Sequence, residues 1–150
     1  FWGVHLLWGA ERLASHLKKL CVQRGLNKPQ LPYFKTWDDF EYVADCEDLI
    51  KVLLSKNDWQ KLEVRLYTSY HEGDGEDTQP KYFLAPKDLV FSGGSSEYSN
   101  DAPTGIALGK LVVAKRHEQL MDRMISSLGL PSNAASRRGW WLTSTHYEDT

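Results

Sequence analysis

The spacing of apolar residues along the chain predicts two helices. In residues 10–25, leucines recur at three- and four-residue intervals, so they share one face, and Gly25 stands where a helix commonly ends. Residues 115–129 repeat this spacing with leucine, methionine and isoleucine and close on Gly129. Both segments therefore read as amphipathic helices with one buried face.

Alternation of apolar and charged residues predicts a strand in residues 61–70. Leu62, Val64 and Leu66 fall on one face, so we expect them to face the core. Apolar, aromatic or β-branched runs predict further strands at residues 1–8, 33–37, 81–85, 88–92, 106–114 and 139–147.

Residues 36–57 allow two interpretations. A helical period would make them one long helix, with Thr36 as its N-cap. Alternatively, the aromatic and β-branched residues of 40–44 form a strand, and a shorter helix starts at Cys46. We prefer two elements and leave the boundary open.

Segments rich in glycine, serine, aspartate and proline predict the loops. Residues 72–79 and 92–104 offer little apolar area to hold them, so we expect them to be mobile. Residues 130–138 read as a further loop, before the last strand.

The order of these elements predicts an α+β fold. We expect a single mixed β-sheet with about three helices packed mainly on one face; the alternative is an α/β three-layer sheet. A chain of 150 residues with 41% apolar residues fits a single globular domain, residues 1–150. The start at Phe1, inside an apolar run, suggests a fragment of a longer chain.

Composition narrows the range of partners and compartments. The net charge is −2; residues 71–109 hold two Lys or Arg against seven Asp or Glu, and residues 110–150 hold six against four. Neither bias is large enough to indicate a membrane or a nucleic acid. Two isolated cysteines, Cys21 and Cys46, suggest buried thiols in a reducing, intracellular compartment, cytoplasm or nucleus.

Catalytic and metal-binding motifs are absent from the sequence. It contains no nucleophile elbow, phosphate-binding loop, dinucleotide fingerprint or paired zinc ligands, so we expect no metal and no cofactor. The catalytic residues of an enzyme would be scattered and are unknown. The first acid–base candidates are His117, Glu118, His146 and Glu148.

One segment resembles a known family. Residues 42–69 place an acidic pair, Glu47 and Asp48, before a helix and then a strand, similar to the last third of a PB1-type, ubiquitin-like module. The basic and acidic pairing clusters of that family are not recognisable here. The same two carboxylates also suit a first helical turn, where they offset the helix dipole.

The cluster Arg137, Arg138, Trp140 and Trp141 is our candidate binding site for a partner. Arginine and tryptophan are frequent anchors of protein interfaces. The two tryptophans point to opposite faces of a strand, so one is expected in the core and one at the surface. We expect the arginines to reach outward from the preceding loop.

These observations favour a non-catalytic protein-interaction or regulatory module of a larger intracellular protein, whose partner is another protein or a peptide. The alternatives are an enzyme domain with scattered acid–base residues and a nucleic-acid-binding domain. The acidic middle of the chain and the isoelectric point of about 6.2 disfavour nucleic acid.

Overall fold

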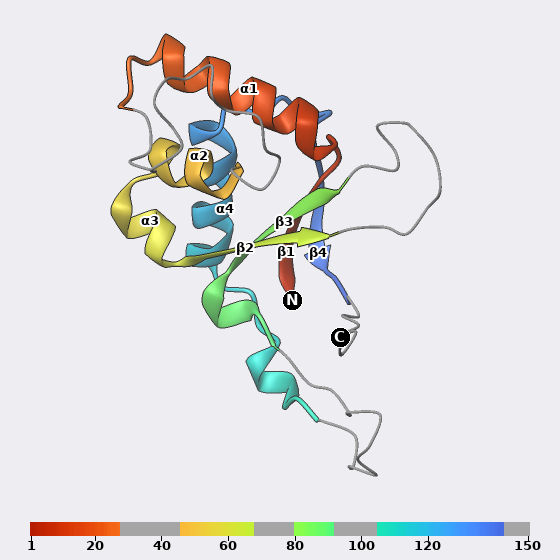
Figure 1. The fold of residues 1–150 in the computed structure, drawn as a ribbon. Helices are drawn as coiled ribbons and strands as arrows, with labels where there is room; N and C mark the ends of the chain where they lie inside the picture. The colour runs from red at the N-terminus through yellow and green to blue at the C-terminus, as the bar shows by residue number, and fades with distance from the viewer. Residues whose placement is uncertain (28–45, 68–79, 92–104, 143–150) are drawn as a thin grey trace, which may run out of the picture.

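The structure is a computed structural model that describes residues 1–27, 46–67, 80–91 and 105–142. Figure 1 shows the elements in chain order. They are β1 (Trp2–Leu6), α1 (Ala10–Gln23), α2 (Cys46–Leu53), α3 (Lys56–Gln60), β2 (Leu62–Tyr67), β3 (Lys81–Pro86), the short 3-10 helices η4 (Lys87–Leu89) and η5 (Leu108–Lys110), α4 (Lys115–Ser127) and β4 (Ala135–Trp140).

The four described strands form one sheet in the order β2-β3-β1-β4. All three pairs are antiparallel, and β1 lies between β3 and β4. The α+β class is therefore confirmed, and the pairing within the described sheet is antiparallel throughout. β1 is an inner strand of the sheet, because it pairs with β3 on one side and with β4, from the last part of the chain, on the other.

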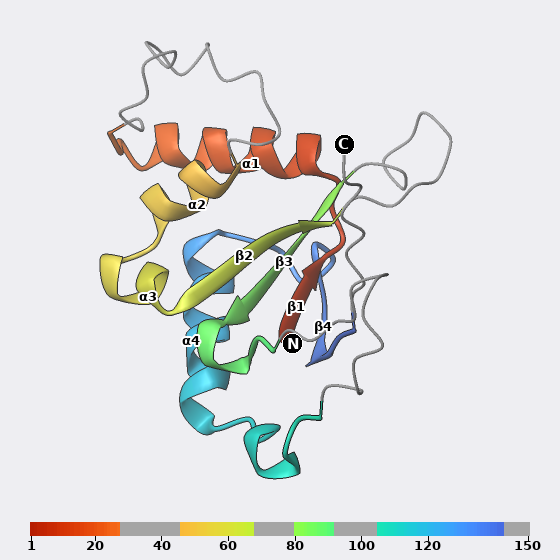
Figure 2. The same cartoon turned by 60° about the horizontal axis from the view of Figure 1, so that its bottom comes forward.

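The main hydrophobic core lies between the sheet and the helices, which Figure 2 shows on one side of the strands. Val4 and Leu84 stand opposite each other on β1 and β3, and both are fully buried. The helices add their apolar stripes to this core, with Leu13 and Leu17 from α1, Leu49 and Ile50 from α2, and Leu120, Met121 and Met124 from α4. Burial of this layer is the main stabilising contribution.

Aromatic rings gather on the opposite face of the sheet. His5 stacks on Phe83 with ring centroids 4.6 Å apart, and Phe1 meets Phe83 edge-on at 5.1 Å. The Trp141 ring packs against both His5 and Phe83, and its Nε1 donates to the carbonyl oxygen of Gly3, 3.1 Å away. This cluster fastens the chain just beyond β4 to β1.

Most predicted elements are confirmed. The helices predicted in residues 10–25 and 115–129 are α1 and α4, and the strands predicted in residues 1–8, 61–70 and 81–85 are β1, β2 and β3. Leu62 is buried and Val64 packs against the core, whereas the side chain of Leu66 lies outside the described residues.

In the ambiguous segment, the first described residues form α2, Cys46–Leu53, and the choice between one long helix and two elements stays open. The earlier part of that segment, residues 36–45, lies outside the described residues. The strand expected at 33–37 and the mobile loops expected at 72–79 and 92–104 lie outside them as well.

Two predicted strands are wrong. In residues 88–92, the described part is the end of η4 and two residues that follow it; Asp88 binds α4, and Leu89 turns into the core. The segment 106–114 contains η5 and no strand, and Leu108 is 83% exposed. Apolar runs suggested strands here, but a run alone does not specify a pairing partner.

The last strand begins earlier than predicted. Residues 135–138, expected to be loop, form most of β4, which ends at Trp140. Val4 and Leu6 of β1, which stand opposite Arg138 and Ala135, supply the pairing that overrides the loop-like composition of the segment.

Candidate functional site

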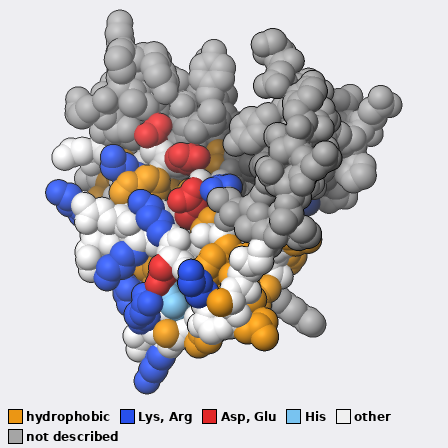
Figure 3. Space-filling view, turned by 90° about the horizontal axis from the view of Figure 1, so that it is seen from below, with side chains coloured by type: hydrophobic (Ala, Val, Ile, Leu, Met, Phe, Trp, Pro, Cys, Tyr) orange, Lys and Arg blue, Asp and Glu red, His pale blue; other side chains and the backbone are white. Residues whose placement is uncertain are grey.

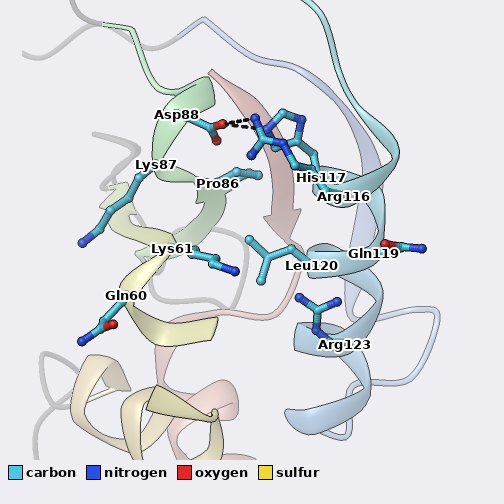
Figure 4. A pocket seen from close by; sticks show the side chains of 10 residues that line it. All are labelled: Gln60, Lys61, Pro86, Lys87, Asp88, Arg116, His117, Gln119, Leu120 and Arg123. Carbon is cyan, nitrogen blue, oxygen red and sulfur yellow. Dashed lines mark hydrogen bonds and ion pairs between the residues drawn. The ribbon is translucent and has the colours of Figure 1, made fainter. Parts of the chain in front are cut away.

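A surface cleft of about 320 Å³ lies between α4, η4 and the junction of α3 with β2. Figure 4 shows its lining side chains, and Figure 3 shows the Lys and Arg side chains gathered on this side of the molecule. The lining residues are Gln60, Lys61, Pro86, Lys87, Asp88, Arg116, His117, Gln119, Leu120 and Arg123. Among them, four cations stand against one carboxylate.

His117 closes one end of the cleft and is fixed by two hydrogen bonds. The backbone N–H of Ala114 donates to its Nδ1 over 2.9 Å. Because Nδ1 accepts, the ring proton is on Nε2, which donates to Oδ2 of Asp88, also over 2.9 Å. The ring is almost completely buried, so it is a capping group of α4 with both nitrogens occupied.

Asp88 joins η4 to the first turn of α4. Its Oδ2 also accepts from Nη2 of Arg116, 2.7 Å away. Partial burial alone would raise the pKa of Asp88, but the hydrogen bonds from His117 and Arg116 outweigh it and hold that pKa below its usual value. The carboxylate therefore stays ionised and compensates Arg116.

Arg123 is held one turn below Leu120 by a buried carboxylate. Its Nε and Nη2 donate to the two carboxylate oxygens of Asp58, over 3.1 and 3.0 Å. Asp58 in turn belongs to the first turn of α3, where its backbone N–H donates to the side chain of Ser55. This bidentate pair fixes α3 against α4 and leaves Nη1 of Arg123 outside the Asp58 pair.

Lys61 and Lys87 complete the cationic lining. Both are exposed, and no hydrogen bond or ion pair is found for either ammonium group among the described residues. In Figure 4, Lys61 extends toward Leu120 and Arg123, whereas Lys87 lies on the rim and extends away from α4. The cleft thus carries two positive charges that no described carboxylate compensates.

The described acid–base candidates have structural partners. Nε2 of His117 donates to Asp88, 2.9 Å away, and Glu118 accepts from Arg138 over 2.7 Å. Burial raises the pKa of the Cys21 thiol to about 11, so it is not a thiolate nucleophile. His146 and Glu148 lie outside the described residues.

In the part of the chain that the structure describes, no group of three or more His, Cys, Asp or Glu side chains is arranged to hold a metal ion. None of the helices described is both long and apolar enough to cross a membrane.

The structure separates the members of the predicted C-terminal binding cluster. Arg138 does not reach outward: its Nη1 donates to Glu118 over 2.7 Å and its Nη2 to Asp122, so it joins β4 to α4. Trp141 belongs to the aromatic cluster on the opposite face, and Trp140 is 44% exposed beside Phe91. The tryptophans thus lie on opposite faces, as expected, but neither is in the core. The side chain of Arg137 is outside the described residues.

The cleft itself was not identified from the sequence. One signal was present: Arg116, Leu120 and Arg123 are spaced to share one helical face, which places two cations around an apolar residue. Lys61 and Lys87 reach the same place only through the pairing of β2 with β3, where Leu62 stands opposite Pro86. The spacing within one segment does not reveal that pairing.

Comparison with known proteins identifies no relative: no protein-family model, curated protein or solved structure matches this chain.

Proposed function

We propose that this chain is a non-catalytic protein-interaction module and that the cleft beside α4 is its binding surface. The observation that carries this proposal is the contrast within the cleft. His117 and Asp88 have intramolecular partners, whereas Lys61 and Lys87 are cations without a described partner. Exposed, uncompensated charge in a concave site favours recognition of a ligand of opposite charge.

The same contacts disfavour an enzyme at this site. A general base needs a nitrogen or oxygen that is free to take a proton from a substrate. Nδ1 of His117 accepts from the backbone, its Nε2 carries a proton, and Glu118 is paired with Arg138. An enzyme would need acid–base groups outside the described residues.

A nucleic acid is the less favoured ligand. Proteins that bind single strands commonly stack bases on aromatic side chains, and the described lining contains no Phe, Tyr or Trp. The net charge of −2 also gives no long-range attraction for a polyanion.

Trp140 is a candidate second contact. Of the cluster Arg137, Arg138, Trp140 and Trp141, it is the described side chain that remains substantially exposed without an ion pair or hydrogen bond of its own. A half-exposed tryptophan on an edge strand offers a large apolar area to a partner.

The proposal is tested by comparing the proteins captured by two variants of equal charge. Lys61→Glu with Lys87→Glu reverses the uncompensated charges of the cleft, whereas Lys19→Glu with Lys51→Glu reverses two exposed lysines on α1 and α2. We expect the first variant to lose at least about tenfold of a partner that the parent and the control retain. Quantitative mass spectrometry of crosslinked complexes measures this.

Equal capture by both variants, with circular dichroism showing both folded, would remove the cleft as the binding surface. Turnover of a substrate by the parent chain would contradict the non-catalytic assignment.

A further inference from the structure

The floor of the cleft is apolar. Pro86 and Leu120 are both buried, and Figure 4 shows the side chain of Leu120 entering the cleft between the two walls. Gln60 and Gln119 are uncharged members of the lining. The atoms of Pro86 and Leu120 that line the cleft offer a small apolar contact area, so the surface suits one apolar group of a ligand as well as charge.

The positive charges lie around this floor. Lys61 and Arg123 extend toward it from opposite walls, and Arg116 stands one turn away from Leu120 on the same helix. Asp88 compensates Arg116, and Asp58 compensates Arg123. The remaining excess comes from Lys61 beside the floor and from Lys87 on the rim, so carboxylates of a ligand would find partners at both places.

We propose that the cleft binds an acidic peptide segment of a partner protein, with one apolar side chain on Leu120 and Pro86 and carboxylates on either side of it. This inference rests on the proposed function and specifies its ligand. The volume of about 320 Å³ accommodates a side chain and its neighbours rather than a folded domain. The partner's contact is therefore a short segment.

The arginines are positioned in advance for such a ligand. Asp58 holds Arg123 through two hydrogen bonds, and Asp88 holds Arg116. Little side-chain freedom is lost when a carboxylate approaches a cation that is already fixed. Lys61 and Lys87 lack such support, so they supply charge and steering rather than fixed geometry.

The test uses a fluorescein-labelled peptide with a central leucine flanked on each side by glutamates, and fluorescence anisotropy with the whole chain. We expect saturable binding that weakens as NaCl rises from about 50 mM to about 500 mM. Replacing the central leucine by serine should weaken binding by about tenfold, because the apolar floor is then left uncovered. Lys61→Glu with Lys87→Glu should weaken it by at least as much, and Lys19→Glu with Lys51→Glu should not.

Three outcomes would overturn the inference: equal affinity for the leucine and serine peptides, equal affinity of the two charge variants, or tighter binding of an oligothymidylate of similar length. If the peptide fails while the crosslinking experiment shows a partner that depends on the cleft, the ligand class is wrong and the module stands. If both experiments fail, the proposed function falls as well.

Discussion

Gly3 allows two central strands to approach each other closely. A Cβ atom added at this position would overlap the carbonyl oxygen of Leu84 and lie 2.9 Å from the Cβ of Ala85. We predict that Gly3→Ala lowers the free energy of unfolding by about 1–3 kcal/mol, because backbone atoms cannot move aside as a flexible side chain can. Urea denaturation measures this change.

Gly139 provides the matched control. It stands directly opposite Gly3 on β4, and nothing lies within 4 Å of an added Cβ. Gly139→Ala should therefore change stability by less than about 0.5 kcal/mol. Equal losses for the two variants would show that the close approach of β1 and β3 is not what requires glycine.

His5 makes stability depend on pH. Its Nε2 is buried without a hydrogen-bond partner among the described residues, and burial, followed by the charge of Lys81, lowers its pKa below the usual 6.5. As the pH falls, the unfolded chain takes up this proton before the native chain does. The stability that depends on neutral His5 is therefore complete above pH 6.5 and is lost as the pH falls toward the native pKa.

His5→Phe tests this dependence, since phenylalanine keeps an aromatic ring on Phe83 and carries no titrating group. Between about pH 8 and about pH 5, we predict a smaller fall in the urea midpoint for the variant than for the parent. The same fall in both would assign the pH dependence to other groups.

Arg138 connects β4 to α4 and is the residue whose role differs most from expectation. Burial alone would lower its pKa, but hydrogen bonds to Asp122 and Glu118 raise it, so the guanidinium stays charged. Because its side chain is only 26% exposed, we predict that Arg138→Ala destabilises the chain by about 1 kcal/mol, the upper end for surface ion pairs. Thermal denaturation measures this.

Arg65 is the control for Arg138. It is half exposed and pairs with Glu63, and both of these residues lie on β2, at the other edge of the described sheet. Arg65→Ala should cost less than about 0.5 kcal/mol. A loss for Arg138→Ala as small as that would mean that the contacts with α4 contribute nothing measurable.

Helices and strands in which apolar residues recur with a regular period could be predicted from the sequence. Strands that depend on which segment pairs with them could not. The stripes of α1 and α4 and the alternation of β2 each place one face in the core, so local pattern and burial agree. Residues 106–114 are equally apolar, yet Leu108 and Val112 are exposed and no strand forms. An apolar run becomes a strand only where another segment of the chain pairs with it, and the sequence of the run does not identify that segment.

The candidate site shows the same limit for the whole molecule. Its lining comes from three separate parts of the chain, residues 60–61, 86–88 and 116–123, and the sheet pairing brings the first two together. The sequence instead indicates the arginine and tryptophan cluster of residues 137–141 as the binding site, although Arg138 and Trp141 have partners within the fold. Composition identifies residues with strong interactions but not whether their partners are internal.

The central position of β1 has a consequence for the order of folding during synthesis. β1 is the first of the described strands to leave the ribosome, while its neighbours, β3 and β4, end at Pro86 and Trp140. One edge of β1 therefore waits for its partner until Pro86 has been made, and the other edge waits until Trp140 has been made. Because such distant contacts close slowly, we expect the nascent chain to expose the buried residues of β1, Trp2, Val4 and Leu6, until these partners have been made. A chaperone that shields these residues during synthesis is therefore expected to increase the yield of native protein.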